Sequence, residues 1–391
     1  MSVTAAKGFV AAGTASGIKA DGIPDMALVA TEDHQPVAAA AVFTTNLAAA
    51  APVQVSRTHL AATGGRAAAV ILNAGNANAA TGEAGRATAQ GACDLVAAEL
   101  RCESDQVLVC STGLIGIPLD LWPFEKTVPA LASELASTSN AANDAAEAIL
   151  TTDTVRKEAV VVASGITVGG MAKGAAMLSP NMATMLAVLT TDAKVEHDEL
   201  QGLLAAAMDN SFHRLTVDGC TSTNDTVIIL ASGKTDQVTD DTSVLSDLIT
   251  RACADLAEQM ACDAEGATKV VKVRVVGAAN HADAAKAARR IAESNLVKCS
   301  FYGEDPYWGR VVSEAASAGA AFDIDKVSVG YGDFVVAVGG IEIDHDREAL
   351  AEYMTQRRLE VTVDFKLGSG EWWLLTNDLT HAYVDENMGT S

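Results

Sequence analysis

Residues 171–193 have the sequence MAKGAAMLSPNMATMLAVLTTDA, and this stretch decides how the rest of the chain is interpreted. Its first part is rich in small residues and contains Lys173, whereas the residues after Thr184 form an apolar run that predicts a buried strand. If the bond between Ala183 and Thr184 were cut, Thr184 would carry a hydroxyl nucleophile beside a free α-amine. With a reference pKa of about 7.7–8.0, that amine could act as a base near neutral pH. The same residues also fit a threonine that merely begins a strand.

Helical and strand patterns alternate on both sides of this stretch. The predicted strands are 67–73, 107–110, 158–169, 185–190, 226–231, 269–276, 298–302, 327–330, 334–338, 359–365 and 372–375. The predicted helices are 82–100, 119–137, 141–150, 199–211, 244–262, 282–294 and 309–318. This alternation indicates an α/β protein, or an α+β protein with layered sheets and helices. No linker or composition shift marks a domain boundary.

The charge balance excludes several classes of partner. The 391 residues include 27 Lys and Arg against 50 Asp and Glu, which gives a formal net charge of −23. Such a surface repels phosphate backbones and anionic lipid headgroups, so we expect no nucleic-acid and no membrane partner. The longest uncharged stretch, residues 35–56, is too polar and too rich in alanine to predict a membrane span.

Cofactor and targeting motifs are also absent from the sequence. The seven histidines and seven cysteines are scattered without ligand spacing, so we expect no metal site and buried thiols in a reducing compartment. Gly233, Lys234 and Thr235 resemble the end of a phosphate-binding loop, but Ile228 stands where its first glycine is required. The first 22 residues contain no run of large apolar residues that would predict a secretory signal, and we therefore expect a cytoplasmic protein.

A series of blocks in a fixed order carries a family resemblance. Besides residues 171–193, the blocks are NAGNANAATG (73–82), CSTGLIG (110–116), TTDT (151–154), VDGCTSTNDT (217–226), DAEG-x-TK (263–269), DPYWGR (305–310) and YVDEN (383–387). Together they resemble the ornithine acetyltransferase family, the glutamate N-acetyltransferases of arginine biosynthesis, whose self-cleaving segment is close to KG-x-GM-x-APNMATML. The resemblance covers essentially the whole chain.

The resemblance implies the family's fold and a chain that cuts itself between Ala183 and Thr184. An α fragment, residues 1–183, and a β fragment, residues 184–391, would stay associated, and family members assemble as oligomers of such pairs. Thr184 would take the acetyl group from N2-acetylornithine, release ornithine, and pass the acetyl group to glutamate. Exchange between two amides is nearly thermoneutral, so no cofactor is expected. Acetyl-CoA stays open as a second donor.

The family's oxyanion hole falls on Thr112 and Gly113, which offer a hydroxyl and a backbone N–H after a predicted strand. The alternative for this pair is an ordinary strand-to-helix turn. By resemblance, Lys173 pairs with the substrate carboxylate, although a lone lysine in a loop is usually a solvated charge. Thr151 resembles a substrate contact, and its alternative is a cap at the start of an element.

Glu265 is the family's substrate-contacting glutamate, and a carboxylate there would meet an ammonium group. A solvated acid at a helix end is the alternative. The resemblance also carries substrate binding to Thr184 itself, to Asn387 and to Ser391.

Three departures from the family pattern stand out. The tail ends MGTS, one residue short and without the family's tyrosine, which weakens the assignment of Ser391. Tyr307 stands where the family usually has asparagine, and Ala176 where it usually has glycine. Two rival functions therefore stay open: an amidase or aminopeptidase on a related self-cleaving scaffold, and a non-catalytic homologue.

Overall fold

The computed structural model describes residues 1–20, 22–178, 185–235 and 242–389. The chain divides into two compact units. Unit 1 comprises Met1–His213 and Cys220–Met260, and unit 2 comprises Arg214–Gly219 and Ala261–Ser391. The predicted fragment boundary, a cleavage expected between Ala183 and Thr184, lies outside the described residues.

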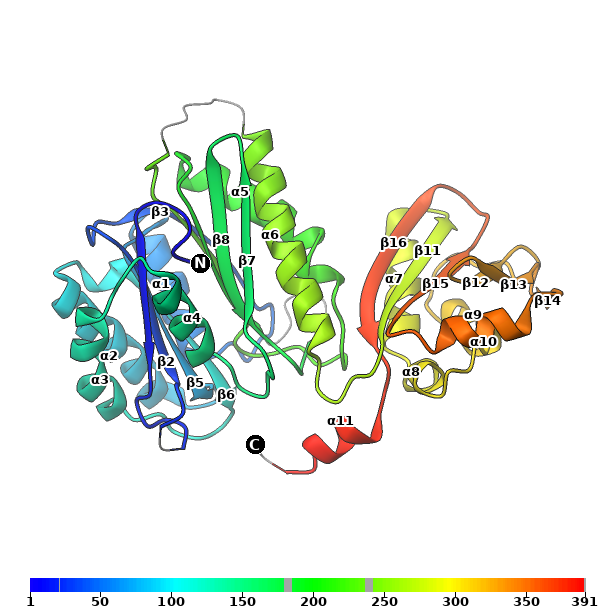
Figure 1. Cartoon of the computed structure of the whole chain (residues 1–391), viewed down its shortest axis with the longest axis horizontal. Helices are drawn as coiled ribbons and strands as arrows, with labels where there is room; N and C mark the ends of the chain where they lie inside the picture. Colours follow the sequence, from blue (N-terminus) through cyan, green and yellow to red (C-terminus); the bar gives the residue numbers. More distant parts are fainter. Residues whose placement is uncertain (21, 179–184, 236–241, 390–391) are drawn as a thin grey trace. The chain divides into compact units, whose positions relative to one another are not determined.

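Two sheets form the centre of unit 1 (Figure 1). The first has four strands in the order β1 (Phe9–Thr14), β2 (Met26–Thr31), β5 (Ala69–Asn76) and β6 (Val107–Leu114). The second has six strands in the order β4 (Arg66–Ala67), β3 (Val37–Phe43), β10 (Thr226–Ala231), β9 (Leu186–Thr191), β8 (Ile166–Lys173) and β7 (Lys157–Ala163). The strands on either side of residues 179–184, β8 and β9, are therefore antiparallel neighbours in one sheet.

The two sheets share an apolar core, which includes Leu72 and Cys110 from the first sheet and Val188 and Ile228 from the second. Helix α4 (Ser139–Ala148) contributes its alanines to the same core. The other face of the first sheet packs against α1 (Ala51–Ala62), α2 (Gly82–Leu100) and α3 (Trp122–Ser133). Helix α5 (His197–Asp209) packs on β3, and α6 (Ser243–Cys262) lies over β7 and β8 (Figure 1). Unit 1 thus has two stacked sheets, with α4 contributing to the core that they share and the other helices packed on their remaining faces.

Unit 2 has one six-stranded sheet. Its order is β14 (Ile341–Glu342), β13 (Phe334–Val338), β12 (Ser328–Tyr331), β15 (Arg358–Asp364), β11 (Val270–Ala278) and β16 (Gly370–Asn377). The helices that contribute to its core are α7 (His281–Ala292), α8 (Asn295–Tyr302), α9 (Trp308–Ala316) and α10 (Arg347–Met354). A short helix, α11 (His381–Glu386), follows the last strand.

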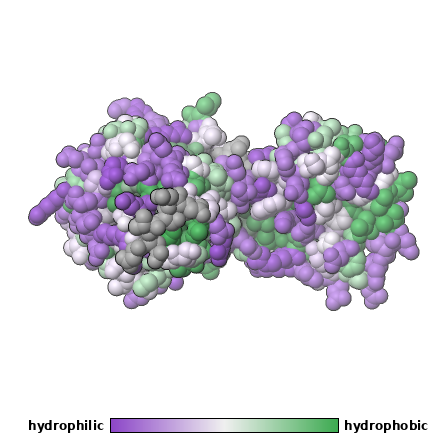
Figure 2. Space-filling model, turned by 90° about the horizontal axis from the view of Figure 1, so that it is seen from above, coloured by the Kyte–Doolittle hydropathy of each residue, from purple (hydrophilic) through white to green (hydrophobic). Residues whose placement is uncertain are grey.

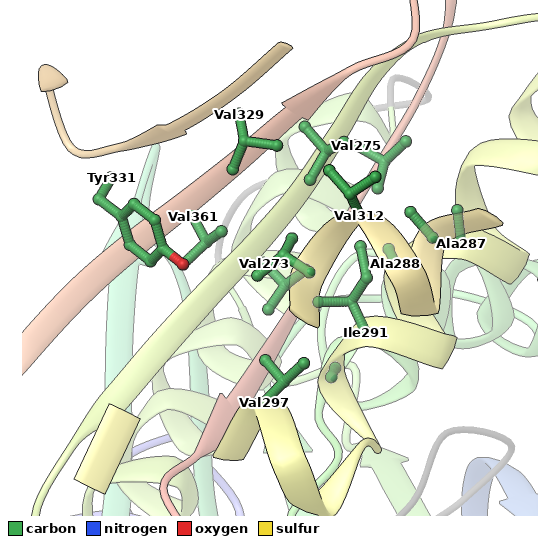
Figure 3. Packing of buried hydrophobic residues seen from close by; sticks show 14 of the residues in the cluster. Val273, Val275, Ala287, Ala288, Ile291, Val297, Val312, Val329, Tyr331 and Val361 are labelled. Atoms are coloured by element: carbon green, nitrogen blue, oxygen red, sulfur yellow. The ribbon is translucent and has the colours of Figure 1, made fainter. Parts of the chain in front are cut away.

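The core of unit 2 follows from the spacing of its apolar residues. In α7, Ala284, Ala287, Ala288 and Ile291 recur at helical spacing and form one buried stripe. The Asn280 side chain caps this helix by accepting a hydrogen bond from the backbone N–H of Asp283. Figure 3 shows Ala287, Ala288 and Ile291 of this helix packed against alternate valines of the strands, such as Val273, Val275 and Val361.

The predicted strand at 298–302 is wrong, because those residues belong to helix α8. Ser294 caps the helix by accepting a hydrogen bond from the backbone N–H of Val297, and Val297 and Phe301 are buried one turn apart. Both elements at 185–190 and 226–231 are strands, as predicted. The strands before residue 44 were not predicted.

Within the described residues, no helix is both long and apolar enough to span a bilayer. Figure 2 shows hydrophilic residues over most of the visible face, with hydrophobic residues in smaller groups between them. Buried thiols were expected for all the cysteines, but Cys220 and Cys299 are exposed. Burial raises the pKa of the Cys110 thiol to about 12, in agreement with a core residue.

Candidate active site

Thr112 and Gly113 lie near the end of β6, where the strand passes very close to β5. Thr112 is buried and stands opposite Ala74, and Gly113 stands opposite Gly75. Gly113 has a φ of +129°, and a Cβ atom placed on it would lie 2.3 Å from the carbonyl carbon of Gly75. Any side chain would push the two strands apart, so this position requires glycine. The pair carries one hydroxyl and one backbone N–H, the two donors that the family resemblance assigns to the oxyanion hole.

A buried asparagine fixes the backbone immediately before Thr112. The Nδ2 of Asn224 donates hydrogen bonds to the carbonyl oxygens of Ala77 (2.6 Å) and Ser111 (2.8 Å). The Ser111 hydroxyl in turn donates to Oδ1 of Asn73 at 2.6 Å. Because Asn224 precedes β10, this network ties the block at residues 217–226 to the strand that carries the candidate oxyanion hole.

The next residue, Asp225, holds the start of β9. Its Oδ1 accepts a hydrogen bond from the backbone N–H of Met185 at 3.0 Å, and its Oδ2 has no hydrogen-bond partner among the described residues. Burial raises the pKa of Asp225 well above its usual value, against the opposing effects of the Met185 N–H, the Ser222 hydroxyl and Lys173. Burial therefore shifts this carboxyl toward its protonated form compared with an exposed aspartate. Ala183 and Thr184, which precede Met185, lie outside the described residues.

Lys173 is the last residue of β8 and stands opposite Leu186 of β9. Its side chain is almost completely buried, so it is not the solvated loop charge of the alternative interpretation. Leu186 also stands opposite Thr226 of β10, so Lys173 and Asp225 lie near the same end of the second sheet. The charge of Lys173 lowers the pKa of Asp225 against the larger effect of burial, which is consistent with this proximity.

Thr151 is joined to Lys173 through Asp153. The backbone N–H of Thr151 donates to Oδ2 of Asp153 at 3.1 Å, and the Nζ of Lys173 lies 3.7 Å from the same oxygen. Lys157 Nζ donates to the other oxygen, Oδ1, at 2.5 Å. The structure therefore brings the candidate substrate residues Thr151 and Lys173 together around a carboxylate that the sequence analysis did not single out.

In unit 2, two further predicted residues contact each other. The Nδ2 of Asn387 donates a hydrogen bond to Oε2 of Glu265 at 2.8 Å. Glu265 follows α6 and is only 9% exposed, so it is not the solvated helix-end acid of the alternative interpretation. Ser391 lies outside the described residues.

Glu265 lines a cavity of about 90 Å³ within unit 2. Three more carboxylates, Asp218, Glu293 and Asp378, line the same cavity together with Lys298. Four acids against one buried ammonium give the cavity an acidic lining, which suits a cationic group better than an anion.

Asp153, Asn224 and Asp225 were missed as candidate site residues. All three lie inside blocks quoted for the family resemblance, and the Asn-Asp pair directly precedes a strand that is apolar after its first residue, Thr226. Polar residues at such a position are a signal that could have identified them. Among the described residues, no group of three or more His, Cys, Asp or Glu side chains is arranged to hold a metal ion.

Comparison with known proteins identifies the relatives of this chain. Residues 10–389 match the family model described as the ArgJ family. The arginine biosynthesis bifunctional protein ArgJ of Streptomyces avermitilis is 46% identical over 393 residues, covering 100% of both chains. The protein of the same name from Thermobifida fusca is 46% identical over 391 residues, again covering 100% of both chains.

One solved structure among the similar proteins is that of ornithine acetyltransferase complexed with ornithine from Mycobacterium tuberculosis. It is 41% identical, with a TM-score of 0.41, and covers 46% of this chain and 94% of that chain. The family model spans almost all residues, and the two bifunctional relatives match the chain over its full length. The chain therefore belongs to the ArgJ family.

Proposed function

We propose that this chain is an acyltransferase of arginine biosynthesis that moves the acetyl group of N2-acetylornithine to glutamate, giving ornithine and N-acetylglutamate. Full-length relatives named as arginine biosynthesis proteins support the pathway. The observation that carries the proposal is the pair Asn224–Asp225. These adjacent residues hydrogen-bond to Ser111, beside Thr112 and Gly113, and to Met185, beside Thr184. Asn224 and Asp225 therefore hydrogen-bond to the residue before the candidate oxyanion hole and to the residue after the candidate nucleophile.

In the proposed reaction, the chain first cuts itself between Ala183 and Thr184. The Thr184 hydroxyl then attacks the acetyl carbonyl of N2-acetylornithine and gives up its proton to its own α-amine. The Thr112 hydroxyl and the Gly113 N–H donate hydrogen bonds to the tetrahedral oxyanion. As the C–N bond breaks, ornithine leaves with that proton and the acetyl group remains as an ester on Thr184.

Glutamate completes the cycle. Its α-amine attacks the ester carbonyl, the Thr184 oxygen leaves and recovers a proton, and N-acetylglutamate is released. The ester has to be kept from water, since hydrolysis would waste the acetyl group.

Substrate recognition follows from charge. Both amino-acid substrates carry an α-carboxylate, which the buried ammonium of Lys173 would bind, with Thr151 beside it. For Glu265 we propose contact with an ammonium group of ornithine, which the acidic lining around it supports. Asn387 and Ser391 keep the substrate roles that the family resemblance implies.

Sheet order supports the association of the two fragments after cleavage. Strands β9 and β10 belong to residues 184–391, yet they lie between β3 and β8 of residues 1–183 in one hydrogen-bonded sheet. Separating the fragments would break two strand interfaces, so the α and β fragments stay paired. We further propose that such pairs assemble into larger oligomers and that the enzyme works in the cytoplasm, where thiols such as Cys93 and Cys110 stay reduced.

Intact mass spectrometry and N-terminal sequencing test the self-cleavage. The purified wild type is expected to give two fragments, the second beginning at Thr184. Thr184→Ala should stay whole and inactive, whereas Thr184→Ser keeps a hydroxyl and should still be cut. A wild type that remains one chain of 391 residues yet transfers acetyl groups would refute the mechanism. An uncut and inactive wild type would indicate a non-catalytic homologue.

Product analysis separates the transferase from its hydrolytic rival. With N2-acetylornithine and glutamate, ornithine and N-acetylglutamate should appear in equal amounts. An amidase or aminopeptidase would instead release free acetate without requiring glutamate. The relatives are named bifunctional, so we propose acetyl-CoA as a second donor, and replacing acetylornithine by acetyl-CoA in the same assay tests it.

A further inference from the structure

We propose that Asp153 is a positioning residue that holds the Lys173 ammonium in place and charged, so that Lys173 can bind the α-carboxylate of both substrates. The inference rests on the proposed function, because it assigns a task to Lys173 within that reaction. Asp153 itself would touch no substrate and would act only through Lys173 and the Thr151 loop.

The contacts of Asp153 join three segments of unit 1. Oδ1 accepts hydrogen bonds from Lys157 Nζ at 2.5 Å and from the backbone N–H of Gly174 at 2.7 Å. Oδ2 accepts one from the backbone N–H of Thr151 at 3.1 Å and lies 3.7 Å from Lys173 Nζ. The carboxylate therefore links the loop before β7, the first residue of β7 and the end of β8. The side chains of Asp153 and Lys157 are completely buried, and that of Lys173 is 3% exposed.

The charges around Lys173 make Asp153 its counter-ion. Two other positive charges lie near Lys173. Lys157 forms an ion pair with the same carboxylate, that of Asp153. Burial lowers the pKa of Lys19, and the charge of Lys173 lowers it further. Asp225 is a second acid that interacts with the charge of Lys173, and burial shifts that carboxyl toward its neutral form. Burial would also raise the pKa of Asp153, but Lys173 and Lys157 hold it well below its usual range. Asp153 is thus a carboxylate that stays ionised 3.7 Å from Lys173 Nζ.

Removing this negative charge leads to a specific kinetic signature. A buried ammonium among like charges loses its proton more easily, so the pKa of Lys173 falls when Asp153 is neutralised. Free enzyme with a neutral Lys173 binds carboxylates poorly, which raises the KM. Once bound, the substrate carboxylate itself stabilises the protonated form, so kcat changes much less. A purely structural role of Asp153 would not produce a KM that depends on pH in this way.

The experiment compares the wild type with D153N and with the double variant D153N/K157M between pH 7 and 9. The readout is the ratio of each variant's KM to that of the wild type, measured for both N2-acetylornithine and glutamate at every pH. Dividing by the wild-type value cancels titrations common to all the enzymes, such as that of the substrate amines. Intact mass confirms that each variant is cut into its two fragments before kinetics begin.

For D153N, we expect the KM ratio to rise with pH for both substrates, by up to about tenfold per pH unit over the range in which Lys173 loses its proton. The double variant also lacks the carboxylate but carries one like charge fewer, so its ratio should still rise between pH 7 and 9, but by less than that of D153N. As a matched control, Glu83→Gln removes a carboxylate from the surface ion pair with Arg86, where the Glu83 side chain is 85% exposed. Its ratio should stay near one throughout.

A KM ratio of D153N that does not change with pH overturns the proposal. If D153N does not fold, the double variant still decides, because it replaces the buried ion pair by neutral side chains of similar size. A double variant whose ratio stays constant from pH 7 to 9 overturns the proposal as well. Failure of the proposed function looks different, since the wild type itself would then transfer no acetyl group from acetylornithine to glutamate.

Discussion

Lys298 in unit 2 allows a stability prediction with a magnitude. Its side chain is only 4% exposed, and Nζ donates hydrogen bonds to the carbonyl oxygens of Val217 (2.6 Å) and Asn377 (2.6 Å) and to Oγ1 of Thr376 (3.2 Å). Burial lowers the pKa of Lys298 from 10.5 to about 8, although nearby Asp218, Asp378 and Glu293 act to raise it. Holding this ammonium charged therefore costs folding free energy at neutral pH.

The sign of the pH effect follows from proton binding. Between about pH 8 and 10.5 the unfolded chain keeps the Lys298 proton while the folded chain has released it, so the free energy of unfolding rises with pH. A lowering from 10.5 to about 8, at about 1.4 kcal/mol per pKa unit, corresponds to a total rise of about 3 kcal/mol. Most of that rise should be complete by pH 10.

Lys298→Met removes the titrating group while keeping an unbranched side chain. Urea denaturation from pH 7 to 10 measures the effect, followed by tryptophan fluorescence, because Trp308, Trp372 and Trp373 lie in unit 2. The difference between wild type and variant cancels the other groups that titrate in this range. The hydrogen bonds lost in the variant shift the whole curve without adding a slope.

We expect the free energy of unfolding of the wild type, relative to Lys298→Met, to rise by about 2–3 kcal/mol between pH 7 and 10. As a control, Lys272→Met removes a lysine of the same unit whose side chain is 39% exposed, and its pH slope should follow that of the wild type. A difference between wild type and Lys298→Met that stays constant with pH would refute the reasoning.

Three further predictions concern unit 1. Thr112→Val keeps the branched shape but loses the hydroxyl donor, so kcat should fall about 100- to 1,000-fold in steady-state kinetics; an unchanged kcat would remove Thr112 from the oxyanion hole. Lys173→Ala should raise the KM for both N2-acetylornithine and glutamate, and unchanged constants for both would contradict the carboxylate-binding role. Asp225→Asn keeps an acceptor for the Met185 N–H, and because the pKa of Asp225 is raised on folding, the stability of the wild type should fall relative to this variant as the pH rises above about 4. Urea denaturation between pH 4.5 and 8 measures that difference, and parallel curves would count against a raised pKa.

The parts of the fold that could be predicted from sequence are those with strong local patterns. Strand β10 (TVIILA) consists mainly of residues that favour strands, and α7 shows a clear apolar stripe. Strands β1 (FVAAGT) and β3 (VAAAAVF) were missed because alanine has no preference for strands and only packing within the sheets makes them extended. Helix α8 shows the opposite case, because a capping serine and a buried helical face outweigh the short apolar run that predicts a strand at 298–302.

Some residues of the candidate site could likewise be predicted from sequence, whereas others could not. Thr112, Gly113, Thr151 and Lys173 were identified because they lie in contiguous blocks of sequence. The tasks of Asn224 and Asp225 depend on hydrogen bonds to segments more than 35 residues away, such as those to Ser111 and Met185. A local sequence pattern cannot indicate contacts between such distant segments, so the contacts of Asn224 and Asp225 can be identified only from the structure.

The six-stranded sheet of unit 1 combines strands from both sides of residues 183/184, which favours folding as one chain. Expressed separately, residues 184–391 would present β9 and β10 with bare edges on both sides, and residues 1–183 would leave the facing edges of β3 and β8 open. Unpaired strand edges promote aggregation. A single uncut chain delivers all these strands at equal stoichiometry. If the proposed cleavage takes place, we therefore expect it to follow the pairing of these strands. If the two fragments were encoded by separate genes, β9 and β10 would have to find β3 and β8 on another chain before the exposed strand edges aggregated.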